Sequence, residues 1–172
     1  ITYIAMINTY LIKKISLALV ECFKTFRKAP PSQLIMTLLV KNEESMLEEN
    51  LLFHKAMGVD SFIITDNNST DSTPEIIRKY KQKGWIKEVI EEKATDYEQK
   101  EWVDRMIWKA KTIYKADWII NADADELWYS PSGNLKTDLS ATHANVLNCE
   151  MRSVYPEENQ PFWQWDKGVK PV

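Results

Sequence analysis

The stretch LIMTLLVKNEESMLEENLLFHKAMGVDSFIITDNNSTD, residues 34–71, decides the fold. Residues 34–40 form a continuous apolar run of strand length, which is typical of a strand covered on both faces. Residues 43–57 favour a helix with acidic residues in its first turn, and Gly58 ends it. A second apolar run follows at residues 61–65. The order strand, helix, strand predicts a right-handed crossover between two parallel strands.

The same alternation continues after this stretch. The next helix is predicted to open at Ser72, which has capping-box spacing to Glu75, and to end before Gly84. Residues 85–90 then favour a third strand.

The strongest helical pattern covers residues 97–115. Its apolar stripe consists of Trp102, Met106, Ala110 and Ile113. Residues 117–121 favour a fourth strand and residues 145–151 a fifth. We therefore predict an α/β domain, with a mostly parallel sheet and helices on both faces.

The first 29 residues are expected to form a separate segment. Apolar side chains recur at helical spacing there among lysines, which predicts an amphipathic helix. This helix packs on the domain or a partner, or it contacts a membrane surface through residues 4–28. Pro30 and Pro31 end it, so residues 30–172 form the predicted domain. We expect a cytoplasmic protein, peripheral to the inner face of a membrane if that contact exists.

Composition narrows the classes of function. The chain of 172 residues has a net charge of −3, so no broad basic surface for nucleic acid is expected. Only two cysteines are present, Cys22 and Cys149, and we interpret them as buried thiols in a reducing compartment.

Polar clusters follow three of the predicted strands. They are Lys-Asn-Glu-Glu at 41–44, Asp-Asn-Asn-Ser-Thr-Asp at 66–71, and Asp-Ala-Asp-Glu at 123–126. In an open α/β sheet, ligands bind beyond the carboxyl ends of the strands, near the point where strand order reverses. The three clusters are therefore expected to face one binding crevice.

The Asp-Ala-Asp-Glu cluster at 123–126 gives the most specific indication of a ligand, because its spacing suits a metal ion. In an extended segment, side chains two residues apart point the same way, so Asp123 and Asp125 can face one site while Ala124 points away. Two like charges held there are costly unless a cation or hydrogen bonds offset them. Carboxylate oxygens suit Mg²⁺ or Mn²⁺, which keep open positions for water and phosphate oxygens.

Other ligand sites fit less well. Glu126 and Asp71 stand where a calcium loop needs glycine, and with four glycines in the chain no Gly-rich phosphate loop of either common kind is present.

Four ordered motifs carry a family resemblance. They are LLVKNEE at 38–44, HKAMGVD at 54–60, DNNSTD at 66–71, and the DW at 117–118 that leads to DADE at 123–126. Together they resemble the family-two-like glycosyltransferases of the GT-A fold, in the branch with KNE, DNxSTD and DxDE motifs. The resemblance covers about residues 34–128 and implies a transferase that uses a nucleotide-diphospho-sugar and Mn²⁺ or Mg²⁺.

The resemblance also implies roles for individual residues. Asp66 looks like the carboxylate that accepts a hydrogen bond from the donor base. Asp123 looks like the residue near the ribose or a metal-bound water, and Asp125 looks like the direct metal ligand of the DXD motif. Glu43 ends the segment that lines base and ribose, and Lys41 could offset diphosphate charge as a point charge.

The acceptor side is less defined. The resemblance implies an inverting enzyme, whose general base follows the DXD motif and deprotonates a glycan or other hydroxyl acceptor. No residue after Glu126 is assigned to that role, and we expect the acceptor half to be incomplete. A UDP-sugar is the favoured donor. A non-catalytic nucleotide-sugar- or glycan-binding fragment is the alternative, and a nucleotidyltransferase ranks lower because no Gly-rich loop follows the first strand.

Several polar and aromatic residues are interpreted as structural. His54 is expected to pack on its helix or to be hydrogen-bonded rather than to catalyse. Glu44 is expected to be a first-turn charge, and Asp71 to cap the helix that follows it. Four tryptophans are expected to anchor the core: Trp102, Trp108, Trp118 and Trp128.

Overall fold

The computed structural model describes residues 32–93, 99–142, 147 and 149. The chain divides into two compact units, Ile1–Ala141 and Thr142–Val172. The described elements belong to the first unit. They are β1 (Leu34–Val40), α2 (Leu47–Ala56), β2 (Ser61–Asp66), α3 (Thr73–Gln82), β3 (Ile86–Glu91), α4 (Gln99–Thr112), β4 (Trp118–Ala122) and α5 (Leu135–Ser140). The predicted helix within residues 1–29 lies outside the described residues. Of the predicted strand at 145–151, only residues 147 and 149 are described, and neither is assigned to a strand. No described helix is both long and apolar enough to cross a membrane.

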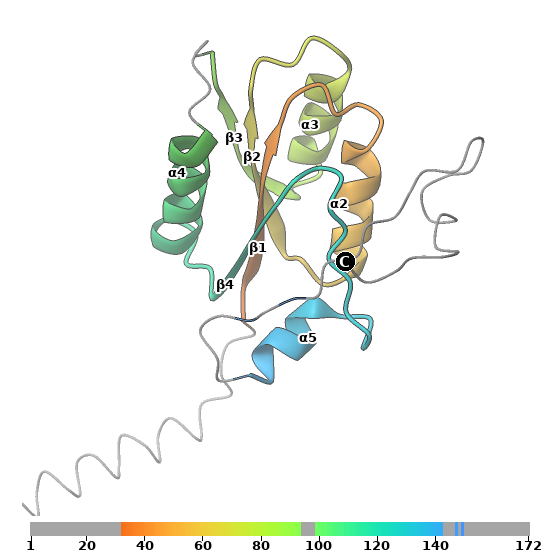
Figure 1. Cartoon of the computed structure of the whole chain (residues 1–172), viewed down its shortest axis with the longest axis vertical. Helices are drawn as coiled ribbons and strands as arrows, with labels where there is room; N and C mark the ends of the chain where they lie inside the picture. The colour runs from red at the N-terminus through yellow and green to blue at the C-terminus, as the bar shows by residue number, and fades with distance from the viewer. Residues whose placement is uncertain (1–31, 94–98, 143–146, 148, 150–172) are drawn as a thin grey trace, which may run out of the picture. The chain divides into compact units, whose positions relative to one another are not determined.

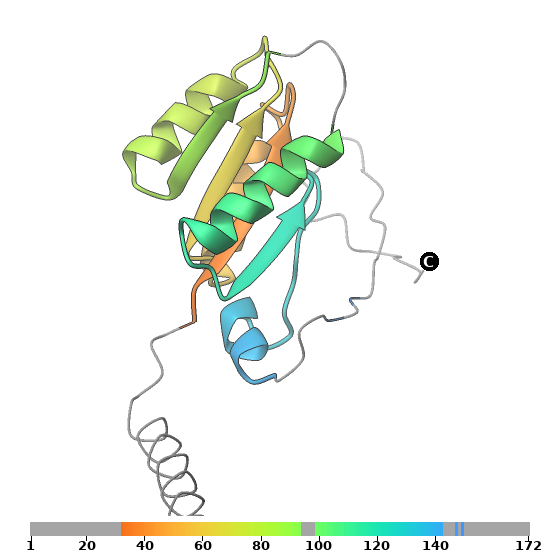
Figure 2. The same cartoon turned by 90° about the vertical axis from the view of Figure 1, so that its left-hand side faces the viewer.

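The sheet is parallel throughout, with the strand order β3-β2-β1-β4. Helices α2 and α3 cover one face of it and α4 covers the other (Figure 1, Figure 2). The predicted α/β architecture with helices on both faces is confirmed. The chain steps outward from β1 to β3 and then returns to place β4 on the other side of β1. Strand order therefore reverses at β1, which is where such sheets bind ligands.

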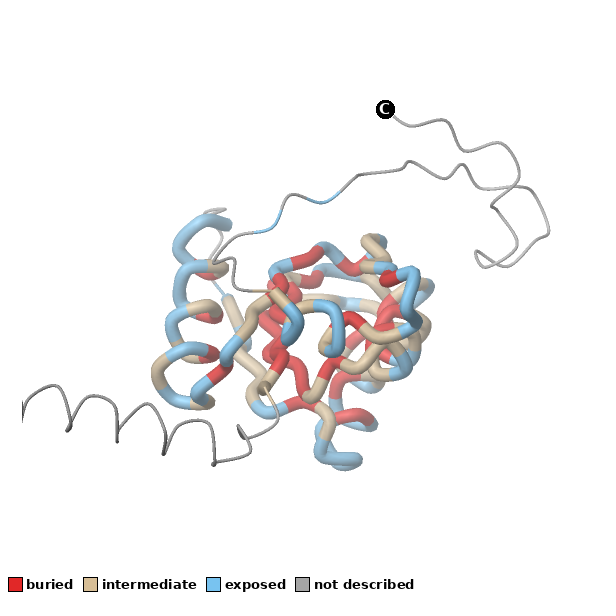
Figure 3. The backbone as a smooth tube through the Cα atoms, turned by 90° about the horizontal axis from the view of Figure 1, so that it is seen from below, coloured by how far each residue is buried: buried red, intermediate tan, exposed pale blue. Residues whose placement is uncertain are grey.

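Alternate residues of β1 enter two separate parts of the core. Met36 and Leu38 pack with α2 and α3, whereas Ile35 packs with Met106 and Ala110 of α4. The strands are mostly buried and the outer surfaces of the helices are exposed (Figure 3). Burial on both faces explains why the first strand reads as a continuous apolar run rather than an alternating one.

Three predictions of burial were wrong. Trp108 and Ile113 of the α4 region are 59% and 52% exposed, because only the stripe through Trp102, Met106 and Ala110 faces the sheet. Cys149 is an exposed thiol rather than a buried one, and Cys22 lies outside the described residues.

Helix α2 begins later than predicted, at Leu47 rather than at residue 43. The backbone N–H of Glu43 donates to Thr73 Oγ1 at 2.8 Å, and that of Glu44 donates to Asp71 Oδ2 at 3.1 Å. These bonds to the β2–α3 loop hold the segment in a turn ahead of the helix. Glu44 is therefore not a first-turn charge; its carboxylate accepts from the N–H of Ser72 at 2.9 Å.

The start of α3 also differs from the prediction. Ser72 occupies the N-cap position but makes no side-chain capping bond, so the predicted capping box is absent. Asp71 Oδ1 accepts from the N–H of Thr73 at 3.0 Å instead. Asp71 thus satisfies the first N–H of the helix from the position before the N-cap, which bears out its predicted capping role in part.

The short helix α5 was not predicted from the sequence. Asn134 caps it by accepting from the N–H of Thr137 at 2.9 Å, and Lys136 pairs with Asp60 at 2.7 Å. The N–H of Leu135 donates to the carbonyl of Met57 at 2.8 Å. These contacts fix α5 against the loop that leaves α2.

Candidate functional site

The carboxyl ends of three strands lie side by side, as the sequence predicted. Strand β1 pairs with β2 so that Val40 stands opposite Asp66, and with β4 so that Leu38 stands opposite Ala122. Neighbouring strands are about 4.8 Å apart, and β4 ends two residues short of the level of Asp66. The ends of β2 and β4 are therefore separated by about 12 Å, with the end of β1 between them. The polar clusters at 41–44, 66–71 and 123–126 therefore share one edge of the sheet.

The cluster after β4 forms a tight turn. The N–H of Glu126 donates to the carbonyl of Asp123 at 3.1 Å, and Ala124 and Asp125 occupy the centre of the turn. Ala124 is buried, whereas Asp123 and Asp125 are exposed. The two aspartates therefore face solvent while the alanine between them packs on the core, which is the arrangement that the alternating pattern predicts.

Glu43 brings a further carboxylate toward these two. Its half-buried position raises its pKa above the usual value through desolvation, and the charges of Asp125, Asp71 and Asp123 raise the pKa further. The carboxylates of the β1–α2 loop and of the turn after β4 thus repel one another across the end of β1. A bound cation would relieve that repulsion.

The oxygen donors at this edge suit a hard divalent cation. Asp123 and Asp125 offer carboxylates from one turn, and Mg²⁺ or Mn²⁺ is commonly held by one or two carboxylates together with water and phosphate oxygens. Among residues 32–93 and 99–142, no three side chains of His, Cys, Asp or Glu are arranged as a ready metal site. Two carboxylates leave most coordination positions of such a cation open to water or phosphate oxygens.

Asp66 ends β2 at the same edge and is 9% exposed. One of its oxygens, Oδ1, accepts from the N–H of Ser69 at 3.1 Å and from the Ser69 hydroxyl at 2.6 Å. The Ser69 hydroxyl also lies 2.9 Å from the N–H of Asn42, which has a φ of 56°. This contact connects the β2–α3 loop to the β1–α2 loop and orients the Asp66 carboxylate.

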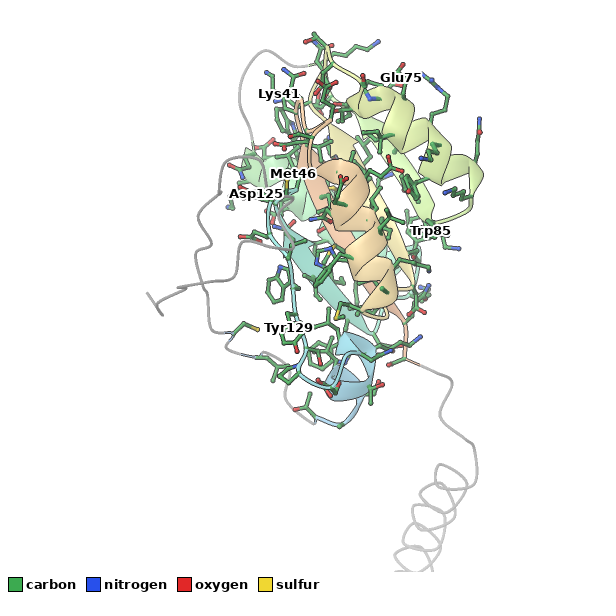
Figure 4. The ribbon with its side chains drawn as sticks, turned by 90° about the vertical axis from the view of Figure 1, so that its right-hand side faces the viewer. Lys41, Met46, Glu75, Trp85, Asp125 and Tyr129 are labelled. Atoms are coloured by element: carbon green, nitrogen blue, oxygen red, sulfur yellow. The ribbon has the colours of Figure 1, made fainter. Side chains whose placement is uncertain are left out.

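Two basic residues, Lys41 and Arg105, differ in their surroundings. Lys41 is exposed on the loop that follows β1, and Figure 4 labels it together with Asp125. Arg105 of α4 instead pairs with Glu92 at 2.6 Å. Among the described residues, Lys41 is thus an exposed basic side chain on a loop at this edge of the sheet.

Two residues behind the turn were missed as contributors to the site. Asn50 is fully buried on α2, and its Nδ2 lies 2.9 Å from the carbonyl of Ala124 and 3.0 Å from that of Glu126. His54, also buried, accepts from the N–H of Trp128 at 2.9 Å, so it is hydrogen-bonded as predicted. The signal that could have found them is their spacing, because Leu47, Asn50, Leu51 and His54 together form the buried stripe of α2.

Comparisons with known proteins agree with this architecture. The protein-family model described as Glycosyltransferase family 92 matches residues 36–161. No curated protein matches the chain. The family model that matches is family 92, so the finer resemblance to the family-two-like branch stays a prediction.

The likeness to TarS of S. aureus supports the fold. TarS of S. aureus superposes with a TM-score of 0.51 at 17% sequence identity, over 63% of this chain and 19% of the TarS chain. The mannosyltransferase PcManGT from Pyrobaculum calidifontis, solved in complex with GDP-Man and Mn²⁺, gives a TM-score of 0.44 at 19% identity, over 66% of this chain and 36% of that one. The chain thus spans about a fifth of the length of the TarS chain.

Proposed function

Because the chain belongs to glycosyltransferase family 92, we propose that it transfers a sugar from a nucleotide-diphospho-sugar to a hydroxyl acceptor. The observation that carries this proposal is the position of two acidic features on either side of the end of β1. Asp66 ends the neighbouring strand β2, and the turn with Asp123 and Asp125 follows the other neighbour, β4. An extended ligand with a base at one end and phosphates at the other fits that separation.

The metal would be held by the turn after β4. Asp125 serves as the direct ligand of Mn²⁺ or Mg²⁺, and Asp123 contributes a second oxygen or holds a metal-bound water near the ribose. When bound, the cation acts as a Lewis acid that stabilises negative charge on the departing nucleoside diphosphate. Glu43 lines the ribose side of the same site, where the nearby charges that raise its pKa favour a cation between these carboxylates.

The nucleotide would be oriented by the loops that follow β1 and β2. The Asp66 carboxylate, already oriented by Ser69, accepts a hydrogen bond from the N–H of the base. Lys41 places a positive charge near the diphosphate from its exposed position after β1. A UDP-sugar is the donor that we favour.

The acceptor hydroxyl would need a general base, which removes its proton as the new bond to the sugar forms. We propose that the transfer inverts the configuration at the sugar, the outcome that the family-two-like resemblance implies. The residues described by the structure supply the donor side of this reaction.

Calorimetric titration with UDP and with GDP, each with and without Mn²⁺, tests the proposal. We expect nucleotide binding that requires Mn²⁺ and is lost in Asp125→Asn. Asp104→Asn on the exposed side of α4 removes the same charge away from the turn and is expected to bind like the unchanged protein. Nucleotide binding that is indifferent to Mn²⁺ and to Asp125→Asn would overturn the metal assignment.

Release of sugar from a bound donor separates an enzyme from a binding module. An enzyme is expected to hydrolyse the donor slowly when no acceptor is present, with the rate lost in Asp125→Asn. Tight, metal-dependent donor binding without any sugar release would favour the binding module instead.

A further inference from the structure

We propose that Asn50 and His54 of α2 are positioning residues that hold the turn bearing Asp123 and Asp125 in the conformation that binds the metal. The inference deepens the proposed function and rests on it, because it assigns a support to the same site. Neither residue reaches solvent, so neither can touch a ligand directly. Both act through the backbone of the segment that follows β4.

The amide of Asn50 joins the helix to the inner side of the turn. Its Nδ2 lies 2.9 Å from the carbonyl of Ala124, 3.0 Å from that of Glu126 and 3.5 Å from that of Asp123. One side-chain amide thus faces the carbonyls of most of the turn. Its two N–H groups can satisfy the two nearest of these acceptors at the same time.

The ring of His54 fixes which way that amide points. His54 Nε2 lies 2.9 Å from the backbone N of Trp128, and a nitrogen that accepts this N–H carries no proton itself. The proton of the neutral ring must then sit on Nδ1, which lies 2.9 Å from both the carbonyl O and the Oδ1 of Asn50. Oδ1 of Asn50 is therefore the acceptor, and its Nδ2 is left to donate to the turn.

The ionisation of His54 agrees with this arrangement. Burial lowers its pKa to about 4, although the hydrogen bond to the backbone of Asn50 acts in the opposite direction. The ring is thus neutral near neutral pH, as the acceptor role of Nε2 requires.

The outer side of the turn is closed by its own last residue. The N–H of Glu126 donates to the carbonyl of Asp123 at 3.1 Å, and the Glu126 carboxylate accepts from the N–H of Asp123 at 3.3 Å. With Asn50 on the inner side, both sides of the turn are fixed. Ala124 then points into the core, and the two aspartates project to solvent together.

The chemistry of α2 indicates that this pair does more than fill the core. The other two positions of its buried stripe are leucines, whereas these two carry an amide and an imidazole. Buried polar groups are costly unless each is paired, and here each pairs with the segment 123–128 or with the other. A site that must hold two like charges together gains from such a rigid backbone.

Four variants test the inference. Asn50→Leu keeps the shape of the side chain but removes both donors, and His54→Phe removes the acceptor for Trp128. His54→Gln is the conservative variant, because its amide oxygen can take the place of Nε2. Ile77→Ala, in the core under α3, lowers stability without touching the turn.

Two properties are measured at a temperature where all variants are folded. The first is the Mn²⁺-dependent affinity for UDP and GDP, and the second is amide hydrogen exchange at Glu126 and Trp128. Asn50→Leu and His54→Phe are expected to lose about 10–100-fold in affinity. In addition, His54→Phe accelerates exchange at Trp128 and Asn50→Leu accelerates it at Glu126. His54→Gln restores most of the affinity, and Ile77→Ala keeps both properties.

The outcomes separate this inference from the proposed function. If Asn50→Leu and His54→Phe lower the melting temperature as Ile77→Ala does, yet bind Mn²⁺ and nucleotide like the unchanged protein, the positioning role is refuted. If the unchanged protein shows no Mn²⁺-dependent binding, the proposed function fails, and the exchange data decide the inference alone. Unchanged exchange at Trp128 in His54→Phe would then refute it.

Discussion

Replacing His54 with glutamine should change how the stability of the fold depends on pH. His54 is fully buried, and its pKa is lowered from the usual 6.5 to about 4, mainly by desolvation. The unfolded chain exposes this ring and binds a proton at its ordinary pKa. The folded state keeps the ring neutral, with Nε2 accepting from the N–H of Trp128. Glutamine at this position can accept the same bond but does not titrate.

The size and sign of the effect follow from this difference in pKa. Above pH 6.5 the ring is neutral in both states, and His54 adds no pH dependence to stability. Between about pH 6.5 and pH 4, only the unfolded state takes up the proton, so the free energy of unfolding falls as the pH falls. One pKa unit corresponds to about 1.4 kcal/mol, so the total loss is about 3 kcal/mol. The loss is complete below the folded-state pKa.

Urea denaturation at pH 7.5 and at pH 4.5 measures the effect. The carboxylates titrate alike in both proteins, so the difference between His54→Gln and the unchanged protein isolates the histidine. We expect His54→Gln to gain about 2–3 kcal/mol relative to the unchanged protein on going from pH 7.5 to pH 4.5. The same difference in unfolding free energy at both pH values would refute a buried, neutral His54.

Two matched pairs of substitutions test the packing of the domain by urea denaturation. Gly58 and Gly84 both have positive φ, but a Cβ at Gly58 would lie 2.7 Å from Asn134 Oδ1, whereas a Cβ at Gly84 meets nothing within 4 Å. Gly58→Ala should therefore cost about 1 kcal/mol more than Gly84→Ala, and equal costs would contradict the contact. Thr65 has a buried hydroxyl without a hydrogen-bond partner in the structure, whereas the Thr37 hydroxyl donates to Asn121 at 2.9 Å. Thr65→Val should be neutral or slightly stabilising and Thr37→Val should cost about 1 kcal/mol; the reverse order would refute this accounting.

Strands β1 and β2 could be predicted because no charged residue interrupts the runs at residues 34–40 and 61–65. Strand β1 was predicted with its observed bounds, since a seven-residue strand buried on both faces leaves little choice of residue type. The predicted starts of β2 and β4 were within one residue of those observed. The convergence of their carboxyl ends then followed from parallel pairing, which the structure confirms.

Errors arose where distant partners decide local structure. The segment at Glu43 looks helical by composition, but bonds to Thr73 and Asp71 hold it in a turn. Helix α5 has only six residues and depends on its cap by Asn134 and on its contact with the loop after α2. Such contacts join residues far apart in the chain, so propensity and periodicity could not reveal them.

The residues of the candidate site also differ in how far the sequence could predict them. Asp123 and Asp125 could be predicted as metal ligands because two carboxylates at this spacing after an apolar strand are typical of such a site, and that assignment stays a prediction. Helical spacing could place Asn50 and His54 on the buried stripe of α2, but it could not reveal their hydrogen-bond partners, which lie on a segment about 74 residues away. From sequence alone, a polar residue on the buried stripe of a helix is interpreted as part of the packed core, because its hydrogen-bond partner is not known.

The central claim is that the carboxyl ends of β1, β2 and β4 together bind one metal–nucleotide complex. Paramagnetic broadening by Mn²⁺ tests this claim most directly. Amide signals are recorded while Mn²⁺ is added in small amounts to the protein saturated with UDP, and again with Asp125→Asn. We predict that the amides of residues 41–43, 66–68 and 123–126 broaden together, most strongly in the last group, and that Asp125→Asn abolishes the effect. Broadening confined to another part of the chain, or persisting unchanged in Asp125→Asn, would contradict the account.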